Sequence, residues 1–133
     1  PKIQLLGVRG FPGNSINHKN SIFIPNHSKK TFVEGEVDMV SGMGYKNKEL
    51  SNGIFEIKTV VTNLGVFDFN GKNNCMQLLS LHPNVSVEDV ITNTGFEIAI
   101  QSDSITSMPS KEELVLIREV LDPQGIRNTI FGE

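Results

Sequence analysis

The residues best suited to chemistry lie in one glycine-rich segment near the start of the chain. Gly7, Gly10 and Gly13 recur every third residue and directly follow a short apolar run. A glycine-rich turn after a buried strand lets the backbone approach a ligand closely, and its N–H groups can hold an anion or a developing oxyanion. The spacing fits neither the dinucleotide fingerprint nor the Walker loop, so an ordinary tight loop remains an open alternative.

Arg9 lies within this segment, between Gly7 and Gly10. A guanidinium group there can pair with a carboxylate through two hydrogen bonds or polarise a carbonyl group. A structural salt bridge to an acidic neighbour is the alternative.

Polar side chains follow the glycines: Asn14, Asn17, His18 and Asn20. Their amides can orient a carbonyl or carboxylate group, and His18 can exchange protons near neutral pH. Because loops are rich in asparagine, a plain loop role stays open for each of them.

The other histidines and the single cysteine form no metal-binding pattern. His27 precedes two lysines and is expected in a solvated turn, with a local phosphate or carboxylate contact as the alternative. His82, beside Pro83, is expected in a surface turn, and the three histidines lie too far apart in sequence to suggest a metal. Cys75 lies in a strand-like run, which predicts a buried, inert thiol and favours a reducing compartment.

The elements that position these residues are mostly short strands. Residues 3–8 are predicted to form a buried strand that feeds the glycine-rich turn, and residues 9–20 a loop. Asn70 and Gly71 favour a hairpin, lengthened by residues 72–74. Further strands are predicted, between turn signals, at residues 21–24, 31–33, 37–40, 55–62, 65–69, 76–81 and 96–100.

Two helices are marked by their first turns. Ser86 is a candidate N-cap before acidic and apolar residues, and Gly95 follows as a stop signal. Ser110 and Glu113 match the S-x-x-E capping box of a second helix, which Pro123 ends.

Composition predicts one folded, loop-rich domain. The chain has 133 residues, of which 38% are apolar and 20% charged. A net charge of −3 gives no basic surface for nucleic acid, and no apolar run approaches the roughly 20 residues needed to span a bilayer. We therefore expect a soluble, cytoplasmic protein. The start at Pro1, just before an apolar run, suggests a segment of a longer protein, although methionine removal gives the same beginning.

Eight segments, in one-letter code, carry a further signal: GVRGFPGNS (7–15), NH (17–18), IPNHSKK (24–30), FVE (32–34), VDMVSG (37–42), VVTNLGVFDF (60–69), NTGFE (93–97) and LIREVLDP (116–123). In this order they resemble the β subunit of glutaconate-CoA-transferase-like enzymes, which belong to the class I CoA-transferase family. The resemblance is greatest to the branch that hydrolyses ring-containing CoA thioesters in steroid catabolism.

This resemblance implies an open α/β fold of the CoA-transferase type. With the strand signals, we expect about seven to eight short strands and two main helices, in a single domain (1–133) that forms the C-terminal part of a β subunit. The resemblance also implies an α subunit as partner and an acyl-CoA substrate, in a hetero-oligomer or a self-associating fragment. No permanently bound cofactor is expected, because coenzyme A enters as part of the substrate. No metal is expected either, since the spacing of the histidines suggests none.

The glycine-rich turn of such enzymes supplies backbone N–H groups to the thioester oxygen in an active site between subunits. Carried onto this chain, the catalytic residues are Arg9, Gly10 and Phe11. The expected substrate-binding residues are Gly7, Gly13, Asn14, Asn17 and His18.

The nucleophile of the transferases is a glutamate in the earlier half of the β subunit, outside this chain. Residues 51–53 superficially resemble its signature but lack a glutamate before the asparagine. Transferases of the family tend to have a small residue where Arg9 stands, whereas the ring-cleaving branch resembles this chain in having arginine.

Three functions stay open at this point. The first is hydrolytic opening of a cyclic diketone or enone attached to CoA, and the second is transfer of CoA between carboxylic acids through a glutamyl-CoA thioester. The third is a non-catalytic scaffold, because a fold does not fix a function.

Overall fold

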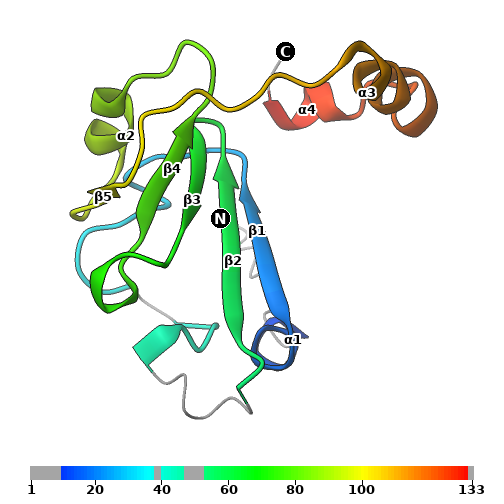
Figure 1. The fold of residues 1–133 in the computed structure, drawn as a ribbon. Coiled ribbons are helices and arrows are strands. Elements are labelled where there is room, and N and C mark those ends of the chain that lie inside the picture. Colours follow the sequence, from blue (N-terminus) through cyan, green and yellow to red (C-terminus); the bar gives the residue numbers. More distant parts are fainter. Residues whose placement is uncertain (1–9, 38–39, 47–52, 132–133) are drawn as a thin grey trace, which may run out of the picture.

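An open mixed sheet of five strands forms the centre of the computed structural model, which describes residues 10–37, 40–46 and 53–131 (Figure 1). The strands lie in the sheet in their chain order: β1 (Lys19–Ile24), β2 (Glu56–Thr62), β3 (Gly65–Asp68), β4 (Gln77–Leu81) and β5 (Ala99–Ile100). β1 pairs with β2 and β4 with β5 in parallel, whereas the two central pairings are antiparallel.

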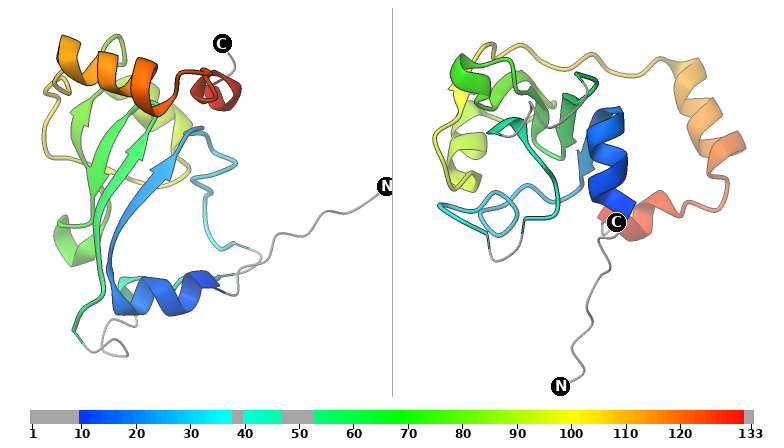
Figure 2. Two further views of the ribbon diagram at one scale, coloured as in Figure 1. Left: turned by 90° about the vertical axis from the view of Figure 1, so that its right-hand side faces the viewer. Right: turned by 90° about the horizontal axis from the view of Figure 1, so that it is seen from below.

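Helices flank the sheet and extend beyond it (Figures 1 and 2). In chain order they are α1 (Gly10–Asn17), the 3-10 helix η2 (Lys72–Asn74), α2 (Val87–Asn93), α3 (Lys111–Val115), the π-helical η3 (Leu116–Leu121) and α4 (Arg127–Phe131). α1 lies at the amino end of β1, and α3 runs directly into η3.

The core lies between the sheet and α2. Phe67, Leu78 and Val90 are fully buried there, and Phe32 packs against them from the loop after β1. Gly95, just beyond α2, lies against the backbone of residues 32–34, where its N–H group donates to the Phe32 carbonyl at 2.7 Å. A Cβ atom at position 95 would be 2.5 Å from that carbonyl oxygen, so this close approach requires glycine.

The mixed α/β class and both capped helices are confirmed, and the strands differ in number. Residues 31–33 form no strand, because the Thr31 and Phe32 N–H groups both donate to the Ser28 carbonyl and close a turn that buries the Phe32 ring. Of residues 96–100, only Ala99 and Ile100 pair in the sheet. Residues 3–8 and part of 37–40 lie outside the described residues.

The hairpin between β3 and β4 is confirmed, but its sharpest bend is not at Asn70-Gly71. Asn73 and Asn74 take the positive φ angles, 59° and 56°, within η2. Cys75 follows this turn and is exposed, so the prediction of a buried thiol is wrong: the residue lies in the loop, before β4 begins. His82 begins the predicted turn, which the Val85 N–H group closes on the His82 carbonyl at 3.1 Å. Its side chain is half-buried, however, and bonds the Thr62 carbonyl through Nε2 at 2.9 Å.

Candidate functional site

From Gly10 to Asn17 the chain forms a helix, α1, where a loop was predicted, and polar side chains of this stretch bond to the helix backbone. The Ser15 hydroxyl donates to the Pro12 carbonyl at 2.9 Å, and the Asn17 amide donates to the Gly13 carbonyl at 2.8 Å. Pro12 occupies the first turn, where a missing N–H group removes no helical hydrogen bond. Residue types that are typical of loops thus supply the hydrogen bonds that stabilise this short helix.

The first turn of α1 contains Gly10 and Phe11, two of the predicted catalytic residues. The first N–H groups of a helix have no acceptor within the helix and lie at the positive end of its dipole. Because Pro12 has no N–H group, the amides of Gly10 and Phe11 are the donors at the start of this turn. Such donors suit a developing oxyanion.

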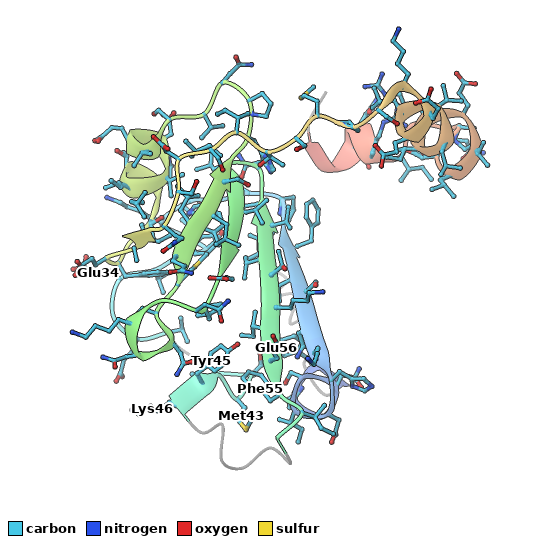
Figure 3. All side chains as sticks on the ribbon, in the orientation of Figure 1. Glu34, Met43, Tyr45, Lys46, Phe55 and Glu56 are labelled. Carbon is cyan, nitrogen blue, oxygen red and sulfur yellow. The ribbon has the colours of Figure 1, made fainter. Side chains whose placement is uncertain are left out.

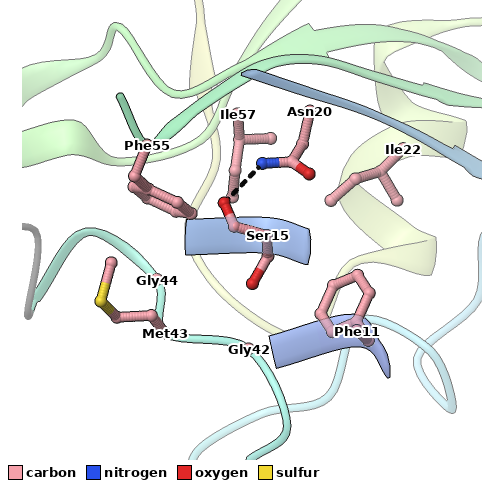
Figure 4. Close-up of a pocket in the computed structure, with 9 residues that line it drawn as sticks. All are labelled: Phe11, Ser15, Asn20, Ile22, Gly42, Met43, Gly44, Phe55 and Ile57. Atoms are coloured by element: carbon pink, nitrogen blue, oxygen red, sulfur yellow. Dashed lines mark hydrogen bonds between the residues drawn. The ribbon is translucent and has the colours of Figure 1, made fainter. Parts of the chain in front are cut away.

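Phe11 is held by Gly42, which lies on the loop after the first strand. A Cβ atom at position 42 would be 2.9 Å from Cε1 of the Phe11 ring, so the ring packs directly on the glycine backbone. Figure 4 shows this contact at the edge of a small cavity. The cavity is lined by Phe11, Ser15, Asn20, Ile22, Gly42, Met43, Gly44, Phe55 and Ile57.

The volume of this cavity, about 40 Å³, decides what it can hold. A single water molecule needs roughly 10–15 Å³ on this measure, whereas ligand pockets typically have about 300 Å³ or more. In the described part of the chain this cavity is therefore a packing space that seats α1, too small for a substrate-sized ligand.

Tyr45 ties the loop that carries Gly42 to the sheet. Its hydroxyl accepts the Ile57 N–H group at 2.9 Å and donates to the Ile57 carbonyl at 3.3 Å. Its ring lies 5.2 Å from the Phe55 ring and 5.6 Å from the Phe69 ring, between centroids, below the amino end of β2 (Figure 3). The loop that holds Phe11 is thus fixed on β2.

Asn20 fixes the other end of α1. Its side-chain amide donates to the Ser15 carbonyl at 2.9 Å, the His18 carbonyl at 2.8 Å and the Glu56 carbonyl at 3.4 Å. The first of these bonds is drawn in Figure 4. Asn20 therefore closes the helix against β2, in place of the substrate contact that the sequence left open.

The predicted substrate-binding residues are spread along α1. Asn17 and His18 lie about 10 Å from Gly10 along the helix axis, at 1.5 Å per residue. His18 Nδ1 bonds the Asn14 carbonyl at 3.0 Å, so the His18 ring lies back on its own helix. Gly13 and Asn14 are exposed and lie in the second turn of α1, closer to Gly10 than Asn17 and His18 are. Gly7 and Arg9 lie outside the described residues.

A larger hollow, of about 640 Å³, opens on the other side of Tyr45. Ile57 and Phe69 contribute apolar surface to it, and Lys46, Asn73 and Asn74 contribute polar groups. It contains none of the predicted site residues.

His27 was missed as a buried residue by sequence reasoning. It is 3% exposed, and its ring stacks on Phe32 with 3.9 Å between centroids, so the predicted solvated turn is wrong. Its Nδ1 lies 3.1 Å from Thr62 Oγ1 and its Nε2 lies 3.0 Å from Thr94 Oγ1. The local sequence does not indicate this burial, because polar residues 28–30 follow His27. Its partner Thr94 lies 67 residues further along the chain.

The hydrogen bonds indicate one neutral tautomer of His27. The Thr94 hydroxyl donates to the Val90 carbonyl at 2.7 Å, so it accepts from an Nε2–H group. The Thr62 hydroxyl accepts two backbone N–H groups, from Leu64 and Gly65. Its hydrogen has two acceptors in reach, Nδ1 at 3.1 Å and the Gly65 carbonyl at 3.5 Å, and the shorter contact favours Nδ1. Burial lowers the pKa of His27 from 6.5 to about 4. The ring joins β2 to the end of α2 as a neutral group.

Within residues 10–37, 40–46 and 53–131, no cluster of three or more His, Cys, Asp or Glu side chains could hold a metal ion. No helix in that part of the chain is long and apolar enough to cross a membrane.

Comparison of sequences identifies relatives of known function. The chain is 46% identical over 132 residues to the IpdB subunit of the cholesterol ring-cleaving hydrolase of Rhodococcus jostii, a match that covers 96% of this chain and 52% of that protein. It is 30% identical over 129 residues to the β subunit of the glutaconate CoA-transferase of Acidaminococcus fermentans, covering 92% of this chain and 48% of that protein. The chain thus spans about half the length of the relatives it matches. No protein-family model matches it.

Comparison with solved structures finds the same two enzymes. The fold superposes on the crystal structure of Rhodococcus jostii IpdAB with a TM-score of 0.86 at 44% identity, over 97% of this chain and 53% of that chain. It superposes on the glutaconate CoA-transferase of Acidaminococcus fermentans with a TM-score of 0.80 at 27% identity, over 98% of this chain and 51% of that chain. By sequence and fold together, the chain is similar to glutaconate-CoA-transferase-like β subunits and matches about half the length of each.

Proposed function

We propose that the chain is the C-terminal half of the β subunit of a heteromeric enzyme that opens a cyclic diketone or enone attached to CoA, in steroid ring catabolism. The observation that carries the proposal is the 46% identity to a ring-cleaving hydrolase subunit over nearly the whole chain, against 30% to a transferase subunit. An α subunit completes the active site, and coenzyme A is part of the substrate, with no permanently bound cofactor. The reducing conditions suited to a chain with one cysteine favour a cytoplasmic location.

In the proposed reaction, water adds to a ring carbonyl and a carbon–carbon bond of the ring breaks. The hydroxyl group of water becomes part of a new carboxylate, and a proton from solvent ends on the released α-carbon. Negative charge develops first on the carbonyl oxygen and then on the enolate. The amides of Gly10 and Phe11 stabilise that charge at the start of α1, as oxyanion-hole donors do.

Arg9 adds a fixed positive charge next to this turn and pairs with enolate or carboxylate oxygens. The base that activates water is a glutamate outside this chain, on the partner subunit. Gly7, Gly13 and Asn14 contact the reacting part of the substrate. Asn17 and His18, at the other end of α1, contact a more distant part of the extended CoA thioester.

Removing one amide donor tests the role of the first turn. Gly10→Pro in the complete heteromer deletes an N–H group at the first helical position, where proline preserves the helix. We expect kcat for ring opening to fall about 100-fold to 1,000-fold, the usual effect of losing an oxyanion-hole donor.

Gly10→Ala is the matched control, since no atom lies within 4 Å of an added Cβ atom there and the N–H group is retained. If Gly10→Pro loses no more activity than Gly10→Ala, the amide has no catalytic role.

CoA transfer between carboxylic acids is the second candidate, favoured by the likeness to the glutaconate CoA-transferase in sequence and fold. It requires a nucleophilic glutamate in the other half of the β subunit. The sequence encoded beside this chain is the direct test: a glutamate in the family signature supports transfer, and its absence removes this candidate.

A further inference from the structure

The end of the chain forms an arm whose apolar side chains face solvent. We define the C-terminal arm as residues 107–131, which include α3, η3 and α4. Met108, Val120 and Leu121 are 71%, 64% and 70% exposed, and Leu116 and Ile117 are also exposed. Met108, Pro109, Leu116 and Ile117 contribute the apolar part of a groove of about 420 Å³.

The arm stands apart from the rest of the described chain. It leaves the sheet after β5, crosses beyond the upper ends of the strands and continues past β1 (Figure 1), and the view from below in Figure 2 separates it from the sheet in the same way. Apart from η3, no strand or helix of the described ranges packs substantially on α3.

The sequence of α3 and η3 has the apolar residues of a helix that packs on another part of a protein. Leu114, Ile117 and Leu121 recur at helical spacing, with Leu116 and Val120 beside them. Of the charged residues, Lys111, Glu112 and Glu113 precede them, Arg118 and Glu119 lie among them, and Glu113 lines the edge of the groove. A helix of eleven residues is marginal in water without tertiary packing. The capping box of Ser110 and Glu113 helps to start this helix but does not cover its apolar side.

The length of the relatives indicates which part of the protein covers the apolar side chains of the arm. The superposition on the Rhodococcus jostii IpdAB chain includes 97% of this chain, too much to leave out the arm, but only 53% of that chain. A second half of similar size therefore completes the fold in that relative. β1 is the last strand on its side among the described strands, and the arm extends past that side. Helices of α/β domains bury their apolar stripe on the sheet of the same domain.

We propose that the apolar face of the C-terminal arm, formed by Met108, Leu116, Ile117, Val120 and Leu121, is the docking surface for the other half of the same β subunit. The arm then covers the part of the sheet that this half contributes. This inference rests on the proposed place of the chain in a β subunit, and it does not depend on the reaction.

Charge insertion into the face tests the proposal in the complete subunit, made by joining this chain to the part of Rhodococcus jostii IpdB outside the match. Leu116→Glu and Ile117→Glu are each expected to lower the thermal midpoint by about 5 °C or more, because a charge is then buried at the interface. Arg118→Glu introduces the same group on the charged side of the same helix and is the matched control, with an expected shift of about 2 °C or less.

Hydrogen exchange over residues 111–121 of the unsubstituted complete subunit gives a second measurement that needs no variant to fold. We expect protection at least 100-fold above that of the free chain. The proposal is overturned if Leu116→Glu and Ile117→Glu are as mild as Arg118→Glu, or if this protection is absent. It is also overturned if protection requires the α subunit, IpdA, or self-association of the chain. Neither measurement uses substrate, so failure here is distinct from failure of the proposed reaction.

Discussion

The first turn of α1 takes its position from single residues that lie elsewhere in the sequence. Gly42 admits the Phe11 ring, Tyr45 fixes that loop on β2, and Asn20 closes the helix at its other end. A side chain at position 42 would collide with the Phe11 ring, and the other two contacts are hydrogen bonds to the backbone. If the Gly10 and Phe11 amides bind an oxyanion, these contacts set where the amides point.

Asn20→Ala removes the amide group that makes three hydrogen bonds at the end of α1. We expect the free energy of unfolding to fall by about 1–3 kcal/mol, because the part-buried carbonyl oxygens of Ser15 and Glu56 lose a partner. Denaturant titration checks this value. Asn20→Asp should be at least as damaging, since a carboxylate would face those carbonyl oxygens, and a stability equal to the wild type in both variants would contradict the assignment.

His27 should make stability depend on pH. Its pKa is about 4 in the folded chain and 6.5 in the unfolded chain, so the unfolded state binds the proton first as pH falls. The contribution of His27 is complete above pH 6.5 and is lost progressively between pH 6.5 and about 4. Denaturant midpoints measured across this range should fall for the wild type.

His27→Gln should remove this part of the pH dependence. His18→Gln should retain it, because the His18 side chain is exposed and its ring bonds the Asn14 carbonyl of α1. An unchanged pH profile in His27→Gln would show that the buried ring does not control it.

At the level of elements, local signals were sufficient where the hydrogen bonds are local. The capping boxes of Ser86 with Asp89 and of Ser110 with Glu113 start α2 and α3 as the sequence predicted. The strands β1 to β4 follow from apolar runs between turn residues. α1 is the exception, because its local bonds from Ser15 and Asn17 come from residue types that are typical of loops. His27 was missed because it bonds Thr62 and Thr94, contacts that no local pattern encodes.

Gly95→Ala tests the close approach between the turn after β1 and the end of α2. The new Cβ atom would lie 2.5 Å from both the Glu34 nitrogen and the Phe32 oxygen, so backbone must move. We expect a loss of about 3 kcal/mol in the free energy of unfolding, at the upper end for overpacking.

Gly13→Ala is the control for that substitution. Nothing lies within 4 Å of a Cβ atom at position 13, and alanine is favoured over glycine in a helix by about 1 kcal/mol. Equal effects of the two substitutions on denaturant midpoints would contradict the packing described for Gly95.

At the level of the whole molecule, the chain has a complete small core but an incomplete surface. Phe67, Leu78 and Val90 are fully buried, while α3 and η3 expose most of their apolar residues. Together with a match to about half of each relative, this exposure supports the proposal that the chain is one part of a larger subunit. The α1 turn would then be one side of an active site that other parts complete.

Isotope labelling of the complete heteromer distinguishes ring hydrolysis from CoA transfer most directly. The enzyme is incubated in ¹⁸O-labelled water with a CoA thioester that carries a cyclic diketone and with an added carboxylic acid that can accept CoA. The products are analysed by mass spectrometry. We predict a ring-opened product that keeps its CoA group and has one ¹⁸O atom in a new carboxylate. An intact ring, with CoA moved to an added carboxylic acid, would contradict the proposed hydrolysis.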